Sequence, residues 1–205
     1  MHSKEHDLDH NRNQEDELVL VVDESDNYLY SAAKADAHAK KLWHRQVYVL
    51  IANSQGEILL QKRSPNRQFD PGKWTASVSG HVTHGDSYQD AACRETKEEL
   101  GLILTHLVYI GKVLSYSQSQ DEVCGGPSAL YIASAEIDPG SLELQESEVS
   151  AVAFFPPAAI YETIRHNATL CFQSEIISFA QDFIPVFEFY WTTAGGQACR
   201  PHPST

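Results

Sequence analysis

Residues 80–102 read GHVTHGDSYQDAACRETKEELGL, and the rest of the chain can be interpreted around them. Between residues 87 and 100 there is no Gly or Pro, and most residues favour helices. Asp86 or Ser87 can cap the start of such a helix, and Gly101 can end it. The sequence therefore predicts a helix over 87–100.

Three glutamates share one side of this expected helix. Glu98 and Glu99 lie three and four positions after Glu95, so their side chains are neighbours of the Glu95 side chain at 3.6 residues per turn. Arg94 lies four residues before Glu98 and can pair with it, but one arginine does not neutralise three acids. A hard divalent cation with oxygen ligands, Mg²⁺ or Mn²⁺, would do so. The alternative interpretation is an acidic helix face in contact with water.

The whole segment resembles the signature of the Nudix hydrolases. That signature is Gly, five residues, Glu, seven residues, Arg-Glu, an apolar residue, any residue, Glu-Glu, any residue, Gly and an apolar residue. Here Asp86 replaces the first Glu and Thr96 replaces the apolar residue, while the remaining fixed positions match. The match favours a metal site over a solvated acidic face. The resemblance implies an α+β Nudix fold, in which a mixed β-sheet is sandwiched between α-helices.

The resemblance also implies roles for individual residues. Glu95 would orient or deprotonate water, Arg94 would hold the glutamates in place, and Glu122 is a second candidate base or a further metal ligand. The expected cofactor is Mg²⁺ or Mn²⁺. Its implied oxygen ligands are Glu95, Glu98, Glu99 and the carbonyl group of Gly80.

Residues outside this segment resemble one branch of the superfamily, the isopentenyl-diphosphate isomerases. The matching features are His44, Arg63, the turn Pro71-Gly72-Lys73-Trp74-Thr75 and the pair Gly80-His81. By this resemblance His44 and His81 would be metal ligands. The isomerases have a third histidine ligand seven residues before the position of His44. That position is Ala37 here, with His38 next to it. The sequence leaves open whether these histidines bind metal or make structural hydrogen bonds.

Two positions separate this chain from the isomerases. Ser79 stands where they place a reactive cysteine, and of their Glu-x-Glu run only Glu122 is matched. Isomerisation of an alkene requires two well-placed acid–base groups, and a serine hydroxyl is a far poorer acid than a thiol. We therefore expect a divalent-metal-dependent hydrolase that cleaves the diphosphate linkage of a small nucleoside- or prenyl-type substrate. The alternatives are an isopentenyl-diphosphate delta-isomerase and a non-catalytic sensor with the Nudix fold.

Substrate-binding residues are expected next to the PGKWT turn. Arg63 and Arg67 lie in the loop before it, and a planar guanidinium can bind two phosphate oxygens at once. Trp74 is a further candidate. The alternatives are two ordinary surface arginines and a tryptophan that packs in the core.

The composition limits the class of protein. The chain has 205 residues and a formal net charge of −13, which argues against a nucleic-acid partner held by electrostatic attraction. No apolar run approaches the length of a membrane span, and residues 1–16 resemble neither a signal peptide nor a transit peptide. We expect a cytoplasmic monomer or homodimer that binds a small-molecule diphosphate. The four cysteines form no zinc-binding pattern in the sequence: Cys93, Cys124, Cys171 and Cys199.

The expected organisation is a disordered acidic tail over 1–16, a Nudix domain over 17–192 with its core at 43–166, and a loose tail over 193–205. Hydrophobic alternation and turn residues predict strands at 17–22, 28–30, 45–52, 57–62, 107–116, 128–137 and 149–155. Further helices are expected at 32–43, 156–166 and 172–184, and a polar turn at 117–127.

Overall fold

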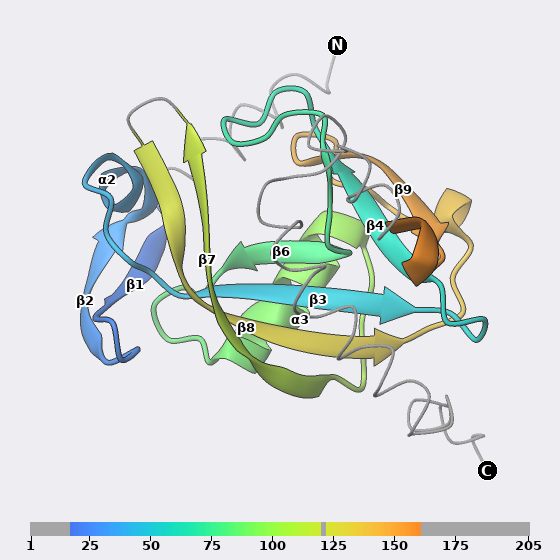
Figure 1. Cartoon of the computed structure of the whole chain (residues 1–205), viewed down its shortest axis with the longest axis horizontal. Helices are drawn as coiled ribbons and strands as arrows, with labels where there is room; N and C mark the ends of the chain where they lie inside the picture. The colour runs from blue at the N-terminus through green and yellow to red at the C-terminus, as the bar shows by residue number, and fades with distance from the viewer. Residues whose placement is uncertain (1–16, 120–121, 161–205) are drawn as a thin grey trace.

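A computed structural model describes residues 17–119 and 122–160 (Figure 1). The expected tails at 1–16 and 193–205, the helix at 172–184 and most of the helix at 156–166 lie outside the described residues. No helix in the part of the chain that is described is long and apolar enough to cross a membrane.

The described residues form a two-stranded hairpin and a seven-stranded mixed sheet (Figure 1). The hairpin pairs β1 (Leu18–Val22) with β2 (Tyr28–Ala33). The large sheet has the order β5-β4-β3-β8-β7, with β6 also beside β3 and β9 beside β4. In it β3 and β8 run parallel, and the other paired strands are antiparallel. Its strands are β3 (Gln46–Ala52), β4 (Ile58–Arg63), β5 (Trp74–Thr75), β6 (Val78–His81), β7 (Val108–Ser119), β8 (Glu122–Ser134) and β9 (Val149–Phe155).

The central strand β3 is buried on both faces, and this divides the core into two layers. Val47, Val49 and Ile51 belong to one apolar cluster, together with residues of the helix α3 (Tyr88–Leu100). The alternate residues Tyr48, Leu50 and Ala52 belong to a second cluster, which includes Ile160 of the helical turn that follows Pro156. Because side chains alternate along a strand, one uninterrupted apolar strand supplies both layers. This agrees with a mixed sheet covered on both sides, as the Nudix resemblance implies.

Helix α3 forms where the sequence predicts it, because its ends are specified locally. The Ser87 side chain accepts from the main-chain N–H of Asp90, and the Asp90 carboxylate accepts from that of Ser87, which is a reciprocal capping box. Gly101 ends the helix at φ 67°, a left-handed conformation that glycine adopts without strain. Thr96 is fully buried, and its hydroxyl donates to the Ala92 carbonyl at 2.6 Å. Its polar group is therefore satisfied within the helix.

Two predicted elements are wrong. The helix expected at 32–43 is shorter: β2 continues to Ala33, and α2 spans only Lys34–Ala39, with no side-chain cap at its N-terminus. Pairing of β2 with β1 keeps the chain extended past Ser31, and this pairing is not visible in the local sequence. A further short helix, the 3₁₀ helix η1, spans Pro139–Ser141.

The polar turn expected at 117–127 is also wrong. Strand β7 continues to Ser119 and β8 begins at Glu122, so the glycines of Gly125-Gly126-Pro127 lie within a strand. Gly126 has φ 150°, and a β-carbon there would lie 2.4 Å from the main-chain oxygen of His44. The glycine is therefore required by the close approach of another backbone.

Candidate functional site

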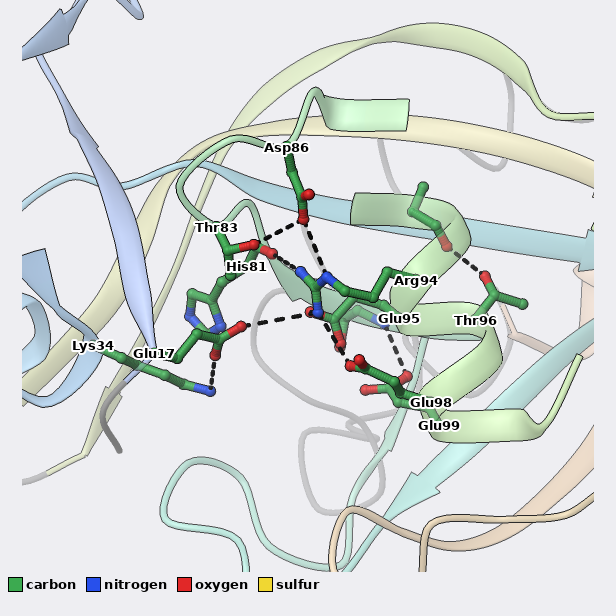
Figure 2. A network of polar contacts seen from close by, with 12 residues as sticks. Glu17, Lys34, His81, Thr83, Asp86, Arg94, Glu95, Thr96, Glu98 and Glu99 are labelled. Atoms are coloured by element: carbon green, nitrogen blue, oxygen red, sulfur yellow. Dashed lines mark hydrogen bonds and ion pairs between the residues drawn. The ribbon is translucent and has the colours of Figure 1, made fainter. Parts of the chain in front are cut away.

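Three carboxylates of α3 gather beside β6 (Figure 2). Glu95 and Glu99 are buried, with 8% and 2% of their surface exposed, whereas the Glu98 side chain is about half exposed. Helical spacing produces this difference, because residues 95 and 99 face the sheet while residue 98 lies at the edge of that face. Two buried acids thus lie next to one that solvent can reach.

Arg94 holds this group together. Its NH1 donates to Glu95 Oε1 at 2.9 Å and to Glu98 Oε2 at 3.1 Å, as the spacing of four residues predicts. Its Nε donates to Asp86 Oδ2 at 3.1 Å, and its NH2 donates to the main-chain oxygen of His81 at 2.9 Å. The residue that replaces the glutamate of the signature, Asp86, therefore acts in this structure as a partner of Arg94.

Glu99 is held from the opposite side. Its Oε2 accepts from Gln61 Nε2 at 3.1 Å and from the main-chain N–H of Ser79 at 3.3 Å. Burial raises the pKa of Glu99 well above its ordinary value, the charges of Glu148 and Glu95 add to the rise, and Arg67 opposes it. Burial likewise raises the pKa of Glu95, and the guanidinium of Arg94 opposes that rise. A cation at this position would favour the ionised form of both acids.

Gly80 lies directly against Glu95. A β-carbon on residue 80 would be 2.0 Å from Cδ and 2.4 Å from Oε1 of Glu95. Any other residue would push the carboxylate away. The glycine of the signature therefore makes room for Glu95 and leaves the main chain of residue 80 beside it.

Sequence reasoning missed two charged residues that the N-terminal elements bring to this site (Figure 2). Lys34 Nζ lies 3.3 Å from Glu17 Oε2, and Glu17 Oε1 lies 3.9 Å from Arg94 NH1. Both side chains are largely buried, at 15% and 19% exposed. Nothing in the sequence around residues 17 and 34 indicates this, because only the docking of the hairpin brings them next to α3.

A second polar cluster consists of His38, His44, His81 and Cys124, each of which can offer a ligand atom within 4.8 Å of the others. Burial lowers the pKa of His38 to about 3 and that of His44 to about 4, and it lowers that of His81 well below its ordinary value. At neutral pH these imidazoles carry a lone pair that can bind a metal. The predicted pair of His44 and His81 is thus brought together, with His38 beside it. Cys124 was missed, because no short spacing in the sequence links it to the histidines.

The predicted substrate-binding residues are all packed into the protein. Arg63 is buried, and its Nε donates to the Phe69 carbonyl at 2.9 Å. Arg67 NH1 donates to Glu148 Oε1 at 2.7 Å. Trp74 packs edge-on against Phe155, with ring centroids 5.0 Å apart, and it lines the second core cluster. Packing is therefore at least part of the role of each.

Glu122, the other predicted catalytic residue, is the first residue of β8 and pairs with Ser119 across the β7–β8 hairpin. Its side chain lies outside the described part of the structure. The carboxylate cluster of α3 and the histidine cluster are connected through His81, whose ring belongs to one and whose carbonyl accepts from Arg94 of the other.

The chain is similar to known proteins both in sequence and in fold. Residues 42–171 match the family model described as NUDIX domain. The chain is 31% identical over 144 residues to an uncharacterized Nudix hydrolase of Yersinia pestis, covering 70% of this chain and 75% of the relative. It is 40% identical over 86 residues to isopentenyl-diphosphate Delta-isomerase 2 of Photorhabdus laumondii, covering 42% of this chain and 49% of that protein. The crystal structure of DR0079 from Deinococcus radiodurans superimposes with a TM-score of 0.65 at 20% identity, covering 80% of this chain and 98% of that one.

Proposed function

The chain belongs to the Nudix hydrolase family, whose members act on pyrophosphate bonds, and we propose that this member cleaves the diphosphate linkage of a small nucleoside- or prenyl-type diphosphate with the help of Mg²⁺ or Mn²⁺. The observation that carries the proposal is the arrangement of the α3 carboxylates. Arg94 bridges Glu95 and Glu98, and Glu99 is buried beside them.

The residues present fit a hard divalent cation. Carboxylate oxygens of Glu95, Glu98 and Glu99, with the carbonyl oxygen of Gly80, form the type of donor set that Mg²⁺ and Mn²⁺ prefer. Two of these acids are buried with raised pKa values and lie near one another, so a cation would relieve their mutual repulsion. Glycine at position 80 leaves the space that this geometry requires. When bound, the cation would offset the charge of the diphosphate and lower the pKa of the attacking water.

The protein's own groups would then orient the reaction. Glu95 would orient the attacking water or accept its proton, while Arg94 keeps the carboxylate of Glu95 in position through its 2.9 Å hydrogen bond. Gln61 and the main chain of Ser79 fix Glu99 from the other side. Such fixed positioning is the main contribution that a protein makes to cleavage of a diphosphate.

The substrate's outer phosphate would lie near the 63–73 loop. We propose that Arg63 and Arg67 bind it, with Trp74 completing that side of the site. The position of Arg67 supports this role, because its positive charge lowers the pKa of Glu99 and is therefore felt at the carboxylate cluster. Its pairing with Glu148 orients the guanidinium by a charge-assisted hydrogen bond, and a guanidinium has further N–H groups with which to bind phosphate.

An isomerase is the second candidate function, and the histidine cluster together with the relative in Photorhabdus laumondii favours it. Ser79 weighs against it. Its N–H donates to Glu99, and its hydroxyl cannot take the place of a thiol as an acid–base group at neutral pH. A non-catalytic sensor is the third candidate. The complete set of carboxylates at positions 95, 98 and 99 weighs against it.

A phosphate-release assay tests the proposal. The full chain is incubated with nucleoside and prenyl diphosphates in the presence of Mg²⁺ or Mn²⁺, with pyrophosphatase and phosphatase controls. We expect metal-dependent phosphate release from at least one compound. In a parallel assay, isopentenyl diphosphate should yield no dimethylallyl diphosphate above the uncatalysed background. Efficient isomerisation without hydrolysis of any compound would replace the proposed function with the second candidate.

A further inference from the structure

The cluster of His38, His44, His81 and Cys124 has the dimensions of a tetrahedral metal site. A tetrahedral ion with bonds of about 2.0–2.3 Å separates its ligand atoms by about 3.3–3.8 Å. Cys124 Sγ lies 3.3 Å from His81 Nε2 and 3.7 Å from His44 Nε2. All four ligand atoms lie within 4.8 Å of one another, so small rotations of the side chains would close the set around an ion.

The histidines present lone pairs to this space. His44 Nδ1 lies 2.8 Å from the Leu42 carbonyl, which can only accept a hydrogen bond, so Nδ1 carries the proton and Nε2 keeps the lone pair. Fixing the tautomer through the second nitrogen is how proteins orient metal-binding histidines. His38 Nε2 is buried and has no hydrogen-bond partner among residues 17–119 and 122–160. An imidazole nitrogen that is buried without a partner is costly unless it binds something.

The sulfur of Cys124 accepts a hydrogen bond from a side chain whose orientation is fixed. Gln46 Nε2 donates to Cys124 Sγ at 2.9 Å. The orientation of the Gln46 amide is fixed, because the hydroxyls of Ser115 and Ser128 donate to its Oε1 at 3.1 and 3.2 Å. A metal binds cysteine as the thiolate, and a thiolate sulfur can accept this hydrogen bond and still donate a lone pair to an ion.

Backbone contacts also bring the segments of His44 and Cys124 together. The main-chain N–H of His44 donates to the Gly125 carbonyl at 3.1 Å, and only a glycine at position 126 permits this close approach. Cys124 is thereby held beside His44. The four ligands come from α2, the segment before β3, the end of β6 and the start of β8, so one ion would connect four parts of the chain.

We propose that His38, His44, His81 and Cys124 form a closed N₃S site for Zn²⁺, distinct from the carboxylate site of α3. Three imidazoles and a thiolate select a borderline-soft metal over Mg²⁺. Four protein ligands fill a tetrahedral shell and leave no position for water, which is typical of structural zinc sites. No carboxylate of the described residues joins this group. The isomerase resemblance indicates histidine ligands, whereas the sulfur, and the metal class that follows from it, come from the tertiary structure alone.

The site would also support the catalytic carboxylates. His81 contributes its ring to the cluster, and its carbonyl accepts from Arg94, which in turn holds Glu95 and Glu98. An ion that fixes His81 would therefore stabilise the position of Arg94.

Cobalt spectroscopy on the full chain tests the proposal without any substrate. Metal-free protein is titrated with Co²⁺. We expect one equivalent to give intense visible bands of tetrahedral Co²⁺ and a near-ultraviolet sulfur-to-cobalt charge-transfer band, both bleached by Zn²⁺ and unaffected by excess Mg²⁺. Cys124→Ser should remove the charge-transfer band, whereas Cys93→Ser should keep it. His38→Gln should weaken cobalt binding at least about 100-fold, since the loss of a hydrogen-bond partner of a metal ligand alone costs 10–100-fold, and His106→Gln should not.

A second measurement needs no variant. Zinc-edge X-ray absorption on wild-type protein loaded with one Zn²⁺ should show one sulfur at about 2.3 Å and three nitrogens at about 2.0–2.1 Å. A shell of nitrogen and oxygen only, a charge-transfer band that persists in Cys124→Ser, or displacement of Co²⁺ by Mg²⁺ would each overturn the proposal. These readouts do not depend on hydrolase activity, so failure of the proposed function would leave them unchanged.

Discussion

The α-carbon of Gly80 faces the carboxyl group of Glu95 so closely that a β-carbon at residue 80 would lie 2.0 Å from Cδ of Glu95. Gly80 is not among the residues with positive φ, so its backbone conformation is one that alanine could adopt. Space, and not conformational freedom, therefore requires glycine at this position. A substitution of Gly80 by alanine would therefore displace the carboxylate of Glu95 without straining the backbone of the strand that carries residue 80.

Gly80→Ala should lower kcat by about 100-fold, because displacing a catalytic group by about 1 Å has an effect of that size. Circular dichroism should show an unchanged fold. Gly111→Ala is the matched control, since a β-carbon there would meet nothing within 4 Å. Equal kcat values for the two variants would contradict the role given to Glu95.

Glu98→Gln and Glu99→Gln should each lower turnover by orders of magnitude, because each removes a ligand charge at the divalent cation. Glu98 is about half exposed, so its replacement should leave the melting temperature nearly unchanged. Glu146→Gln, at an exposed position, is the control and should keep full activity. Removal of metal with EDTA should abolish phosphate release, and added Mg²⁺ should restore it. Full activity in excess EDTA would rule out the metal site.

Arg63→Ala should raise KM by about tenfold to more than a hundredfold, since a charge-assisted hydrogen bond contributes about 1.5–3 kcal/mol. A smaller change in kcat is expected if the contact is equally strong in the ground and transition states. Arg63→Lys should restore binding only in part, because an ammonium group lacks the fork of the guanidinium. Kinetics on the best substrate from the phosphate-release assay measure both values. Since Arg63 also donates to the Phe69 carbonyl, the melting temperature of each variant must be recorded.

Arg67→Ala should also raise KM, but it also removes the ion pair between Arg67 and the buried Glu148. The double variant Arg67→Ala/Glu148→Gln separates the two effects. It should recover the melting temperature while KM stays high. If KM and kcat of both Arg67 variants and of Arg63→Ala equal those of wild type, the phosphate is bound elsewhere, and Lys34 becomes the next candidate because it lies beside the site.

Asp26→Asn should lower the free energy of unfolding by about 1.5–3 kcal/mol at neutral pH, the range for hydrogen bonds to charged groups. Asp26 Oδ1 accepts from Arg45 Nε at 2.7 Å and from the Tyr88 hydroxyl at 3.1 Å, and Oδ2 accepts from Lys112. These contacts attach the β1–β2 turn to β7, to the start of α3 and to the residue before β3. Asn tolerates the φ of 65° at this position, so the substitution removes charge without straining the turn.

The effect of Asp26→Asn should depend on pH. Burial acts to raise the pKa of Asp26, but hydrogen bonds from Lys112 and Arg45 outweigh it and hold the pKa below its ordinary value of 3.8. The unfolded chain therefore binds a proton at a higher pH than the folded one. The stabilisation is complete above about pH 4 and declines as pH falls through the lowered pKa. Urea titrations at neutral and acidic pH measure the difference, with Asp36→Asn at an exposed ion pair as the control. A difference that does not depend on pH would contradict the ionised state of Asp26.

The sequence alone determined the elements whose signals are local. Helix α3 was predictable because its capping box, its apolar face and its terminal glycine all lie within residues 87–101. The same spacing predicted the contact of Arg94 with Glu98. Strand β3 was predictable from its unbroken apolar run, since a strand buried on both faces carries no polar alternation. The limits of β7 and β8 could not be predicted from the sequence. Glycines are typical of turns, but here Gly126 is required by the close approach of the His44 backbone within a strand.

Only the tertiary structure decided which distant side chains meet. The register of β3 sets Gln46 opposite His81 of β6 on one side and opposite Ser128 of β8 on the other. A shift of one residue in either pairing would turn these side chains to the opposite face and separate His81 from Cys124. Residues from four segments thus form one cluster through strand pairing. No spacing in the sequence encodes this cluster, because strand register depends on contacts between segments and not on neighbours along the chain.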